Sequence, residues 1–318
     1  MTKTAPKRIV VTGALGHIGS RLVRVLPTHF PETEIVMVDD LRTQRFASLF
    51  NLPSEGRYRF VERDVTETEL QDVLAEGSVV VHLAAITDAA GSFDIAEEIE
   101  RVNLGATRRV AEVCAAAGCA LIHLSSTSVY GTQKDVVDED CGTEDLAPQS
   151  PYAATKLAEE AFVRSLVEDK GLRAVSLRFG TIFGTSPGMR FHTAVNKFCW
   201  QAVMGTPLTV WRTALDQKRP YLDLSDAVRA IAHFIRSDLF DGRLYNVLTV
   251  NATVRDIVDR IRALVPETKV ELVDARIMNQ LSYEVRCDRV AATGFASRGD
   301  LDEGIEQTIA LLRAGNGA

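Results

Sequence analysis

The sequence lacks the features that mark membrane spans, secretory signals and nucleic-acid binding. No apolar run approaches a length of about 20 residues, which a bilayer span requires, and the polar start of the chain has no apolar signal stretch. Lysine and arginine total 36 against 43 acidic residues, and the net charge of −7 offers no basic footprint for nucleic acid. We therefore expect a soluble, cytoplasmic protein that binds neither membrane nor nucleic acid.

Cysteine is also scarce, with five residues in 318 and no CxxC spacing. A scattered, odd-numbered set indicates reduced thiols rather than a disulfide framework, and it provides no ligand pattern for a metal. We predict no metal site and assign most of the cysteines to the core.

Short apolar runs alternate with helix-period stretches in the first half of the chain, which is typical of βαβ units. Several runs are nearly continuous in valine, isoleucine and leucine, as in strands that are covered on both faces. Strands are expected over 8–12, 34–39, 58–62, 79–83, 120–125 and 173–178, and long helices over 95–117 and 150–168. The pattern predicts an α/β protein with a Rossmann-type doubly wound parallel sheet.

The first expected strand runs into a glycine-rich turn and then a helical stretch. Glycines there allow a tight turn and close approach of the backbone to a pyrophosphate, which the helix N-terminus attracts. The second strand ends at Asp39, 20 residues after Gly19, where a carboxylate binds ribose hydroxyls and favours NAD over NADP, although Asp40 and Arg42 make this choice less clear. Asp64 ends the third strand, where it could bind adenine or cap the next turn. The expected cofactor contacts in these segments are Gly13, Leu15, Gly16, His17, Ile18, Gly19, Asp39, Asp40, Asp64 and Val65.

Glycine and proline break the chain into shorter pieces after Arg178. This change indicates a smaller C-terminal substrate-binding lobe, with 244–247 returning to the main sheet as a strand. We assign residues 1–180 to the NAD-binding domain, with a returning segment at about 221–250, and residues 181–220 and 251–318 to the lobe.

A tyrosine and a lysine share one face of the helix expected over 150–168, because Tyr152 and Lys156 stand four residues apart. A free tyrosine has a pKa near ~10 and is a poor base, but a neighbouring ammonium favours its phenolate. A run of hydroxyl residues ends the strand expected over 120–125. Turns use such runs too, but Ser126 could also share a proton with Tyr152.

These motifs resemble those of the extended short-chain dehydrogenase/reductase family, in particular its nucleotide-sugar epimerase/dehydratase branch. The resemblance covers nearly the whole chain. Its motifs are Thr12-Gly13-x-x-Gly16-x-x-Gly19, His82-Leu83-Ala84-Ala85, Val102-Asn103-Leu104-Gly105-Ala106-Thr107, Ser125-Ser126-x-x-Val129-Tyr130-Gly131, Pro148-Gln149-Ser150-Pro151-Tyr152 with Lys156, Leu177-Arg178-Phe179, Arg219-Pro220-Tyr221 and Tyr245-Asn246-Val247. It implies NAD as the cofactor, a nucleotide sugar as the substrate, and Ser126, Tyr152 and Lys156 as catalytic residues.

The resemblance also implies further binding residues. Asn103 would support the helix beside the cofactor, which Tyr152 and Lys156 would also contact. Arg219 would bind the substrate diphosphate, with a solvated surface arginine as the competing interpretation, and Arg276 is a weaker candidate. The cofactor cleft would be lined by Leu83, Ala84 and Ala85. The remaining expected substrate contacts are Thr87, Ser126, Thr127, Tyr152, Thr181, Arg190 and Asn196.

The run Ser126-Thr127-Ser128 determines which reaction the resemblance implies. Family 4,6-dehydratases carry Thr-Asp-Glu there, whose carboxylates perform the acid–base chemistry of water elimination, and this chain has neither. We therefore predict an NAD-dependent epimerase that oxidises C4 of the sugar transiently and reduces it on the other face. A 4-ketoreductase or an NAD-dependent sugar dehydrogenase would use the same residues, and a dinucleotide-sensing regulator is a third alternative. The family also implies a homodimer through the apolar faces of the two long helices, unless those faces cover the sheet.

Overall fold

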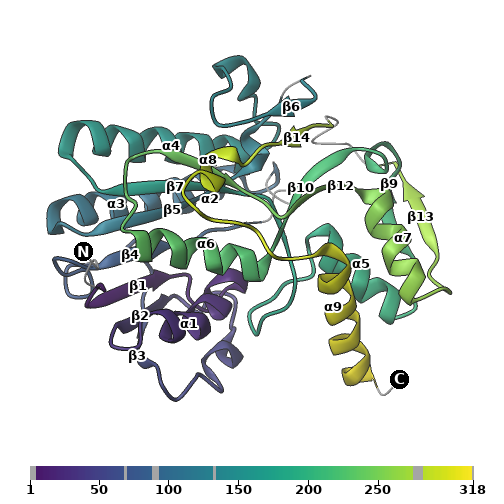
Figure 1. The fold of residues 1–318 in the computed structure, drawn as a ribbon, viewed down its shortest axis with the longest axis horizontal. Coiled ribbons are helices and arrows are strands. Elements are labelled where there is room, and N and C mark those ends of the chain that lie inside the picture. Colours follow the sequence, from purple (N-terminus) through teal and green to yellow (C-terminus); the bar gives the residue numbers. More distant parts are fainter. Residues whose placement is uncertain (1–4, 68–69, 88–92, 132–133, 275–281, 317–318) are drawn as a thin grey trace.

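The computed structural model describes residues 5–67, 70–87, 93–131, 134–274 and 282–316 (Figure 1). Within these ranges, seven strands form one sheet in the order β3–β2–β1–β4–β5–β7–β11. They are β1 (Arg8–Thr12), β2 (Glu34–Asp39), β3 (Arg57–Glu62), β4 (Val79–His82), β5 (Ala120–Ser126), β7 (Ala174–Phe179) and β11 (Leu244–Val247). All neighbours run parallel, so the connections cross over the faces of the sheet. The expected doubly wound fold is confirmed.

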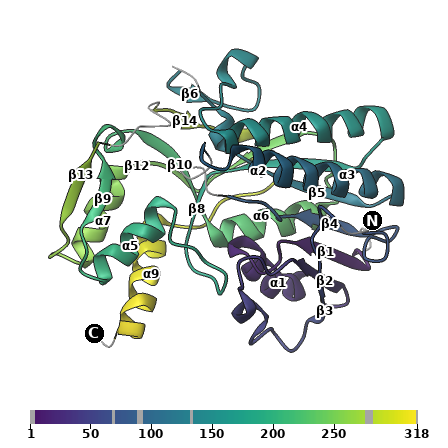
Figure 2. The ribbon, with the colours of Figure 1, turned by 180° about the vertical axis from the view of Figure 1, so that it is seen from behind.

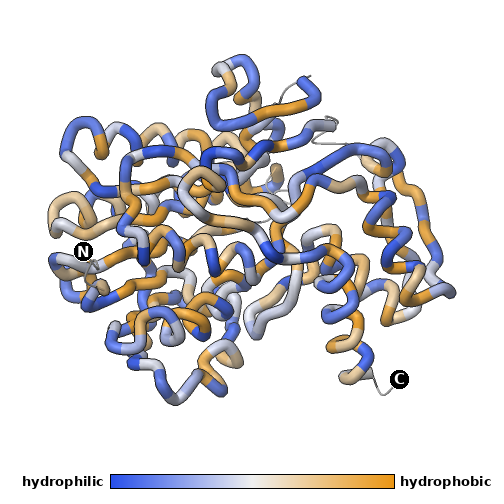
Figure 3. Tube along the Cα trace, viewed as in Figure 1, coloured by the Kyte–Doolittle hydropathy of each residue, from blue (hydrophilic) through white to orange (hydrophobic). Residues whose placement is uncertain are grey.

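Helices cover both faces of this sheet (Figures 1 and 2). Helices α1 (His17–His29) and α6 (Leu224–Ser237) pack on one face, and α3 (Gly105–Ala117) and α4 (Pro151–Lys170) pack on the other. Successive residues of β1 enter the two cores, with Ile9 and Val11 in one and Val10 in the other. Burial on both faces explains the unbroken apolar runs, which Figure 3 shows along the strands.

The two long helices follow the sequence pattern to different degrees. Helix α4 begins as expected, because the Ser150 hydroxyl accepts a hydrogen bond from the Ala153 N–H and Pro151 occupies the first turn. The helix expected over 95–117 is interrupted. It consists of α2 (Ala96–Ile99), a π-helical turn (Glu100–Leu104) and α3. Asn103 lies in that π turn, and such turns are frequent at functional sites.

After β7 the chain forms a smaller lobe with its own core. Strands β8 (Thr181–Phe183), β10 (Lys218–Asp223) and β12 (Val250–Thr253) form one small sheet, and β9 (Leu208–Trp211) pairs with β13 (Val270–Val273). Helices α5 (Ala194–Val203), α7 (Val254–Leu264) and α9 (Leu301–Asn316) pack beside them.

The chain returns from the lobe to the main sheet twice. Strand β11 pairs with β7 at the residues expected from the sequence. Around α8 (Asp288–Ala291), the chain also contributes Val290 and Phe295 to the core under the sheet, although the sequence pattern placed this segment in the lobe. Strands β6 (Val136–Val137) and β14 (Glu284–Val285) form a further parallel pair. Across the described ranges, no helix is long and apolar enough to cross a membrane.

Candidate active site

A cleft of about 750 Å³ lies over the carboxyl ends of the central strands. The turn after β1, the ends of β2 to β5, the first turns of α4 and several lobe residues line it. Open α/β sheets bind their ligands at this edge, where the strand order reverses. Here the reversal lies between β1 and β4. The fold therefore brings the motifs of both halves of the chain to one cavity.

Two glycines of the turn after β1 have no room for a Cβ atom. Gly13 has a φ of +65°, and a Cβ there would lie 2.7 Å from the Ala84 nitrogen. A Cβ on Gly19 would lie 2.5 Å from the Gly13 carbonyl oxygen. Gly16 is the N-cap of α1 and gives no side-chain capping bond, so the first turn of the helix presents backbone N–H groups. This cradle fits a pyrophosphate.

His17 adds a polar side chain to the cradle. Its Nδ1 lies 2.8 Å from the Ser186 hydroxyl of the lobe, while its buried Nε2 has no hydrogen-bond partner in the described chain. Burial, with smaller contributions from His192 and Arg45, lowers the pKa of His17 to about 4. A neutral, partly unsatisfied imidazole that lines the cleft is a further group suited to a bound dinucleotide.

The three expected acids at the cofactor end, Asp39, Asp40 and Asp64, all line the cleft. Asp39 accepts backbone N–H bonds from Leu15 and Leu41, each at 3.0 Å. Burial raises the pKa of Asp39, and these bonds oppose the rise. Asp64 accepts bonds from the Thr66 N–H at 2.7 Å and its hydroxyl at 2.6 Å. Asp64 thus holds a turn, which was the alternative interpretation, while it also faces the cavity.

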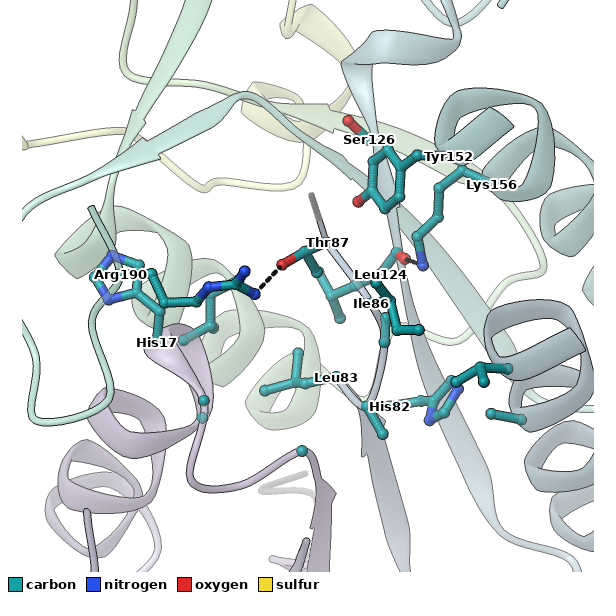
Figure 4. Close-up of a pocket in the computed structure, with 18 of the residues that line it drawn as sticks. His17, His82, Leu83, Ile86, Thr87, Leu124, Ser126, Tyr152, Lys156 and Arg190 are labelled. Carbon is teal, nitrogen blue, oxygen red and sulfur yellow. Dashed lines mark hydrogen bonds between the residues drawn. The ribbon is translucent and has the colours of Figure 1, made fainter. Parts of the chain in front are cut away.

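Ser126, Tyr152 and Lys156 line the same cleft from the end of β5 and from α4 (Figure 4). Ser126 Oγ accepts hydrogen bonds from the Ser128 N–H at 3.1 Å and its hydroxyl at 2.9 Å, which leaves its own proton to donate. Lys156 Nζ lies 5.9 Å from the centroid of the Tyr152 ring and donates to the Leu124 carbonyl at 3.0 Å. Burial raises the pKa of Tyr152, and the charge of Lys156 opposes this rise.

Lobe residues close the cleft from the other side. Arg190 donates to the Thr87 hydroxyl at 3.3 Å and so bridges the cavity (Figure 4). Thr181 and Arg219 also line it. The Arg219 guanidinium lies 5.3 Å from the Tyr283 ring and is partly buried, which lowers its pKa. Arg219 is therefore not the solvated surface arginine of the competing interpretation.

Four expected contact residues do not line the cleft but lie behind the residues that do. Asn103 bonds both backbone groups of Ile86, at 2.8 and 2.9 Å. Buried Asn196 does the same for Gly184, at 3.2 Å each. Buried Thr127 donates to the Phe179 carbonyl because the chain turns at the end of β5, and Leu15 contributes only its backbone at Asp39. Arg276 lies outside the described residues. The expected residues that the structure places along the cleft are Gly13, Gly16, His17, Ile18, Gly19, Asp39, Asp40, Asp64, Val65, Leu83, Ala84, Ala85, Thr87, Ser126, Tyr152, Lys156, Thr181, Arg190 and Arg219.

Sequence reasoning did not single out several other lining residues, among them Arg45, His192 and Trp211. Arg45 follows Asp39 closely enough to be suspected from the sequence. His192 and Trp211 belong to the lobe, where no motif spacing marks them. They meet the cleft only because the lobe packs against the main sheet.

Comparison with known proteins agrees with this geometry. Residues 9–247 match the model of the NAD dependent epimerase/dehydratase family. The trifunctional UDP-glucose 4,6-dehydratase/UDP-4-keto-6-deoxy-D-glucose 3,5-epimerase/UDP-4-keto-L-rhamnose-reductase RHM1 of Arabidopsis thaliana is 28% identical over 97% of this chain and 47% of its own. The uncharacterized UDP-glucose epimerase YtcB of Bacillus subtilis is 29% identical over 76% of each chain. MoeE5, solved in complex with UDP-glucuronic acid and NAD, has a TM-score of 0.83 and 29% identity over 97% of this chain and 99% of that one.

The chain spans less than half the length of the trifunctional plant relative. The family match, in contrast, covers most of this chain, including the glycine turn, Ser126, Tyr152 and Lys156. NAD is the family's cofactor, and the glycine cradle, His17 and Asp39 fit it. This chain belongs to the NAD dependent epimerase/dehydratase family.

Proposed function

We propose that this chain is an NAD-dependent 4-epimerase of a nucleotide-linked sugar. The observation that carries the proposal is the chemistry around Tyr152. The cleft residues at the end of β5, in the turn after it, just before α4 and at the start of β8 include hydroxyls and an amide, namely Ser126, Ser128, Gln149 and Thr181. Among the described lining residues, the acids are Asp39, Asp40, Asp64 and Glu98. All four lie with the cofactor cradle or with Arg42, to which Glu98 is paired at 3.3 Å.

This distribution favours epimerisation over dehydration. Water elimination needs an acid and a base beside the carbon atoms that react, and the described lining residues of β5, α4 and β8 include no carboxylate. Transient oxidation needs only a base for the hydroxyl proton and a hydride acceptor. Tyr152 can serve as that base, and the Ser126 hydroxyl can hold the sugar oxygen during the transfer. The glycine turn and Asp39 would hold NAD, which would supply the hydride-transfer chemistry at C4.

Two arginines suit the rest of the substrate. Arg219 presents a partly buried guanidinium to the cleft, which matches a diphosphate. Arg190 reaches across the cavity to Thr87, where it can contact the sugar or its substituents. The UDP-sugar bound by MoeE5 supports a nucleotide sugar as the substrate class.

The test is proton NMR of the purified protein with a panel of UDP-, GDP-, CDP- and dTDP-sugars, without added NAD. Appearance of a C4 epimer with one sugar is the expected result, because a redox-neutral cycle retains its cofactor. The Tyr152→Phe variant should abolish this conversion. Turnover that consumes added NAD or NADH stoichiometrically would replace the proposal with a dehydrogenase or ketoreductase, and release of a 4-keto-6-deoxy sugar would replace it with a dehydratase.

We also propose a homodimer through α4. Only part of the apolar stripe expected on this helix covers the sheet: Phe162 packs against the core, whereas Ala154, Ala158 and Ala161 are exposed. An exposed stripe of small apolar residues suits close packing of two helices. Light scattering should give twice the mass of the chain, and Ala158→Glu should halve it. A monomeric mass for the unmodified protein would contradict the dimer.

A further inference from the structure

Helix α4 buries two adjacent acids behind the catalytic pair, and the proposed reaction uses neither. Glu159 is 0% exposed and Glu160 is 6% exposed. A buried carboxylate is costly unless it is paired and hydrogen-bonded. Each acid must therefore have specific partners, and the two sets of partners differ in kind.

Glu160 forms a closed pair with Arg178 on β7. Arg178 Nε donates to Oε1 at 2.8 Å, and its Nη2 donates to Oε2 at 2.6 Å. The Ser125 hydroxyl also donates to Oε1. Both oxygens of Glu160 are thus satisfied in a two-pronged pair that fastens α4 to the sheet.

Glu159 is satisfied on one oxygen only. Its Oε2 accepts hydrogen bonds from Lys156 Nζ at 2.9 Å and from the Thr107 hydroxyl at 3.0 Å. The same oxygen lies 2.9 Å from His123 Nε2. Its Oε1 is buried without a hydrogen-bond partner in the described chain. All of these contacts therefore fall on Oε2, the oxygen that lies against the Lys156 ammonium.

His123 can hold Glu159 in place through a hydrogen bond. Its Nδ1 lies 3.1 Å from the Ser176 hydroxyl, which can donate to it, so Nε2 carries the hydrogen that is donated to Glu159. We assign this tautomer from the network. His123 comes from β5, Ser176 from β7 and Thr107 from α3, so three elements around α4 fix the position of Glu159.

The charges around Lys156 nearly cancel. Burial opposes ionisation of Glu159, but the charge of Lys156 and the bond from His123 outweigh it and lower the pKa of Glu159 to about 2. Burial likewise opposes the charge of Lys156, but Glu159 outweighs it and raises the pKa of the ammonium. On β4, burial lowers the pKa of His82 to about 3, so this imidazole stays neutral. Arg178 is compensated by Glu160.

We propose that Glu159 is a positioning residue for the reaction proposed above, because it fixes the Lys156 ammonium against β5 and offsets its charge. Lys156 then stays protonated across the working pH range but supports the Tyr152 phenolate less than a lone ammonium would. Ionisation of Tyr152 therefore needs a higher pH than a simple tyrosine–lysine pair requires. Glu159 sets the acidic limit of activity without touching the substrate.

The experiment measures the Tyr152 pKa without any substrate. Ultraviolet titration of tyrosinate, compared between each protein and its Tyr152→Phe counterpart, isolates this one group. Glu159→Gln should lower the Tyr152 pKa by about 1 unit, because a negative charge next to Lys156 is lost. The acidic limb of kcat/KM should move to lower pH by the same amount. Glu159→Asp keeps the charge and should restore the original titration.

Thr107→Val is the matched control, since it removes a bond to Oε2 but leaves the charge. A Tyr152 pKa that is unchanged in folded Glu159→Gln, or that moves equally in Thr107→Val, would overturn the proposal. If Glu159→Gln does not fold, the double variant Glu159→Leu with His123→Phe removes the same charge and replaces the polar pair with apolar groups. Because the titration needs no turnover, it tests Glu159 even if the epimerase proposal fails.

Discussion

Replacing Gly188 with alanine should push the lobe away from the glycine turn after β1. A Cβ on Gly188 would lie 2.2 Å from the Leu15 carbonyl oxygen and 2.5 Å from that of Gly16. Both atoms belong to the backbone of the turn, so no side chain can move aside. The Gly188 N–H also donates to the Ser20 hydroxyl at 3.0 Å. The alanine variant must displace either the lobe segment or the cradle itself.

The cost follows from these contacts. Overpacking of a close contact costs about 1–3 kcal/mol, and the lost hydrogen bond adds about 1 kcal/mol. If the displacement falls on the cradle, a loss of about 2 kcal/mol weakens NAD binding by roughly 30-fold. Urea unfolding measures the loss of stability, and calorimetric titration measures the loss of NAD affinity.

Gly105→Ala is the control for this substitution. A Cβ at Gly105, at the start of α3, would meet no atom within 4 Å. Alanine there should leave NAD binding unchanged and raise the free energy of unfolding by up to about 1 kcal/mol. If Gly188→Ala behaved like Gly105→Ala in both assays, the close contact between lobe and glycine turn would be refuted.

Three further predictions concern stability, pH and substrate binding. Arg178→Met should leave Glu160 buried without its partner and cost about 3–5 kcal/mol in urea unfolding; the double variant with Glu160→Leu should recover most of this loss, and equal stabilities would contradict the pairing. His82 is neutral when folded, with a pKa of about 3 against an ordinary 6.5, so the unfolded chain binds the extra proton and stability should fall by about 1.4 kcal/mol for each pH unit from 6.5 down to about 3. His82→Gln should flatten that slope in pH-dependent unfolding, and an unchanged slope would count against a buried neutral imidazole. Arg219→Gln should raise KM for the nucleotide sugar roughly 10- to 100-fold with little change in kcat; a loss confined to kcat in steady-state kinetics would argue against a binding role.

Local sequence predicted most of the main sheet. Strands β1 and β2 have the bounds that their apolar runs indicated, because both faces of each are buried and every position between the ends favours apolar residues. The start of α4 followed from Ser150 and Pro151 in the same way. The interruption of the helix over 95–117 did not, since the π turn depends on Asn103 reaching the backbone of Ile86.

The orientation of α4 shows where periodicity stops being informative. Its apolar stripe includes Ala154 and Ala158, yet these residues face outward. The sheet side carries Glu159 and Glu160 instead, which a hydrophobic pattern assigns to the surface. Their burial is possible only because His123 on β5 and Arg178 on β7 supply partners.

The sequence by itself determined the elements whose signals are local: the glycine turn, Asp39 at the end of β2, and the Tyr152–Lys156 spacing on one helix face. Short-range sterics and hydrogen bonds specify such features within a few residues. Only the tertiary structure decided which side chains meet across the cleft. In that structure Thr127 and Asn196 lie behind the lining residues, and Arg190 bonds Thr87 across the cavity. Glu159 contacts Lys156. Such contacts depend on how the lobe and the helices pack on the sheet, and no spacing along the chain encodes that packing directly.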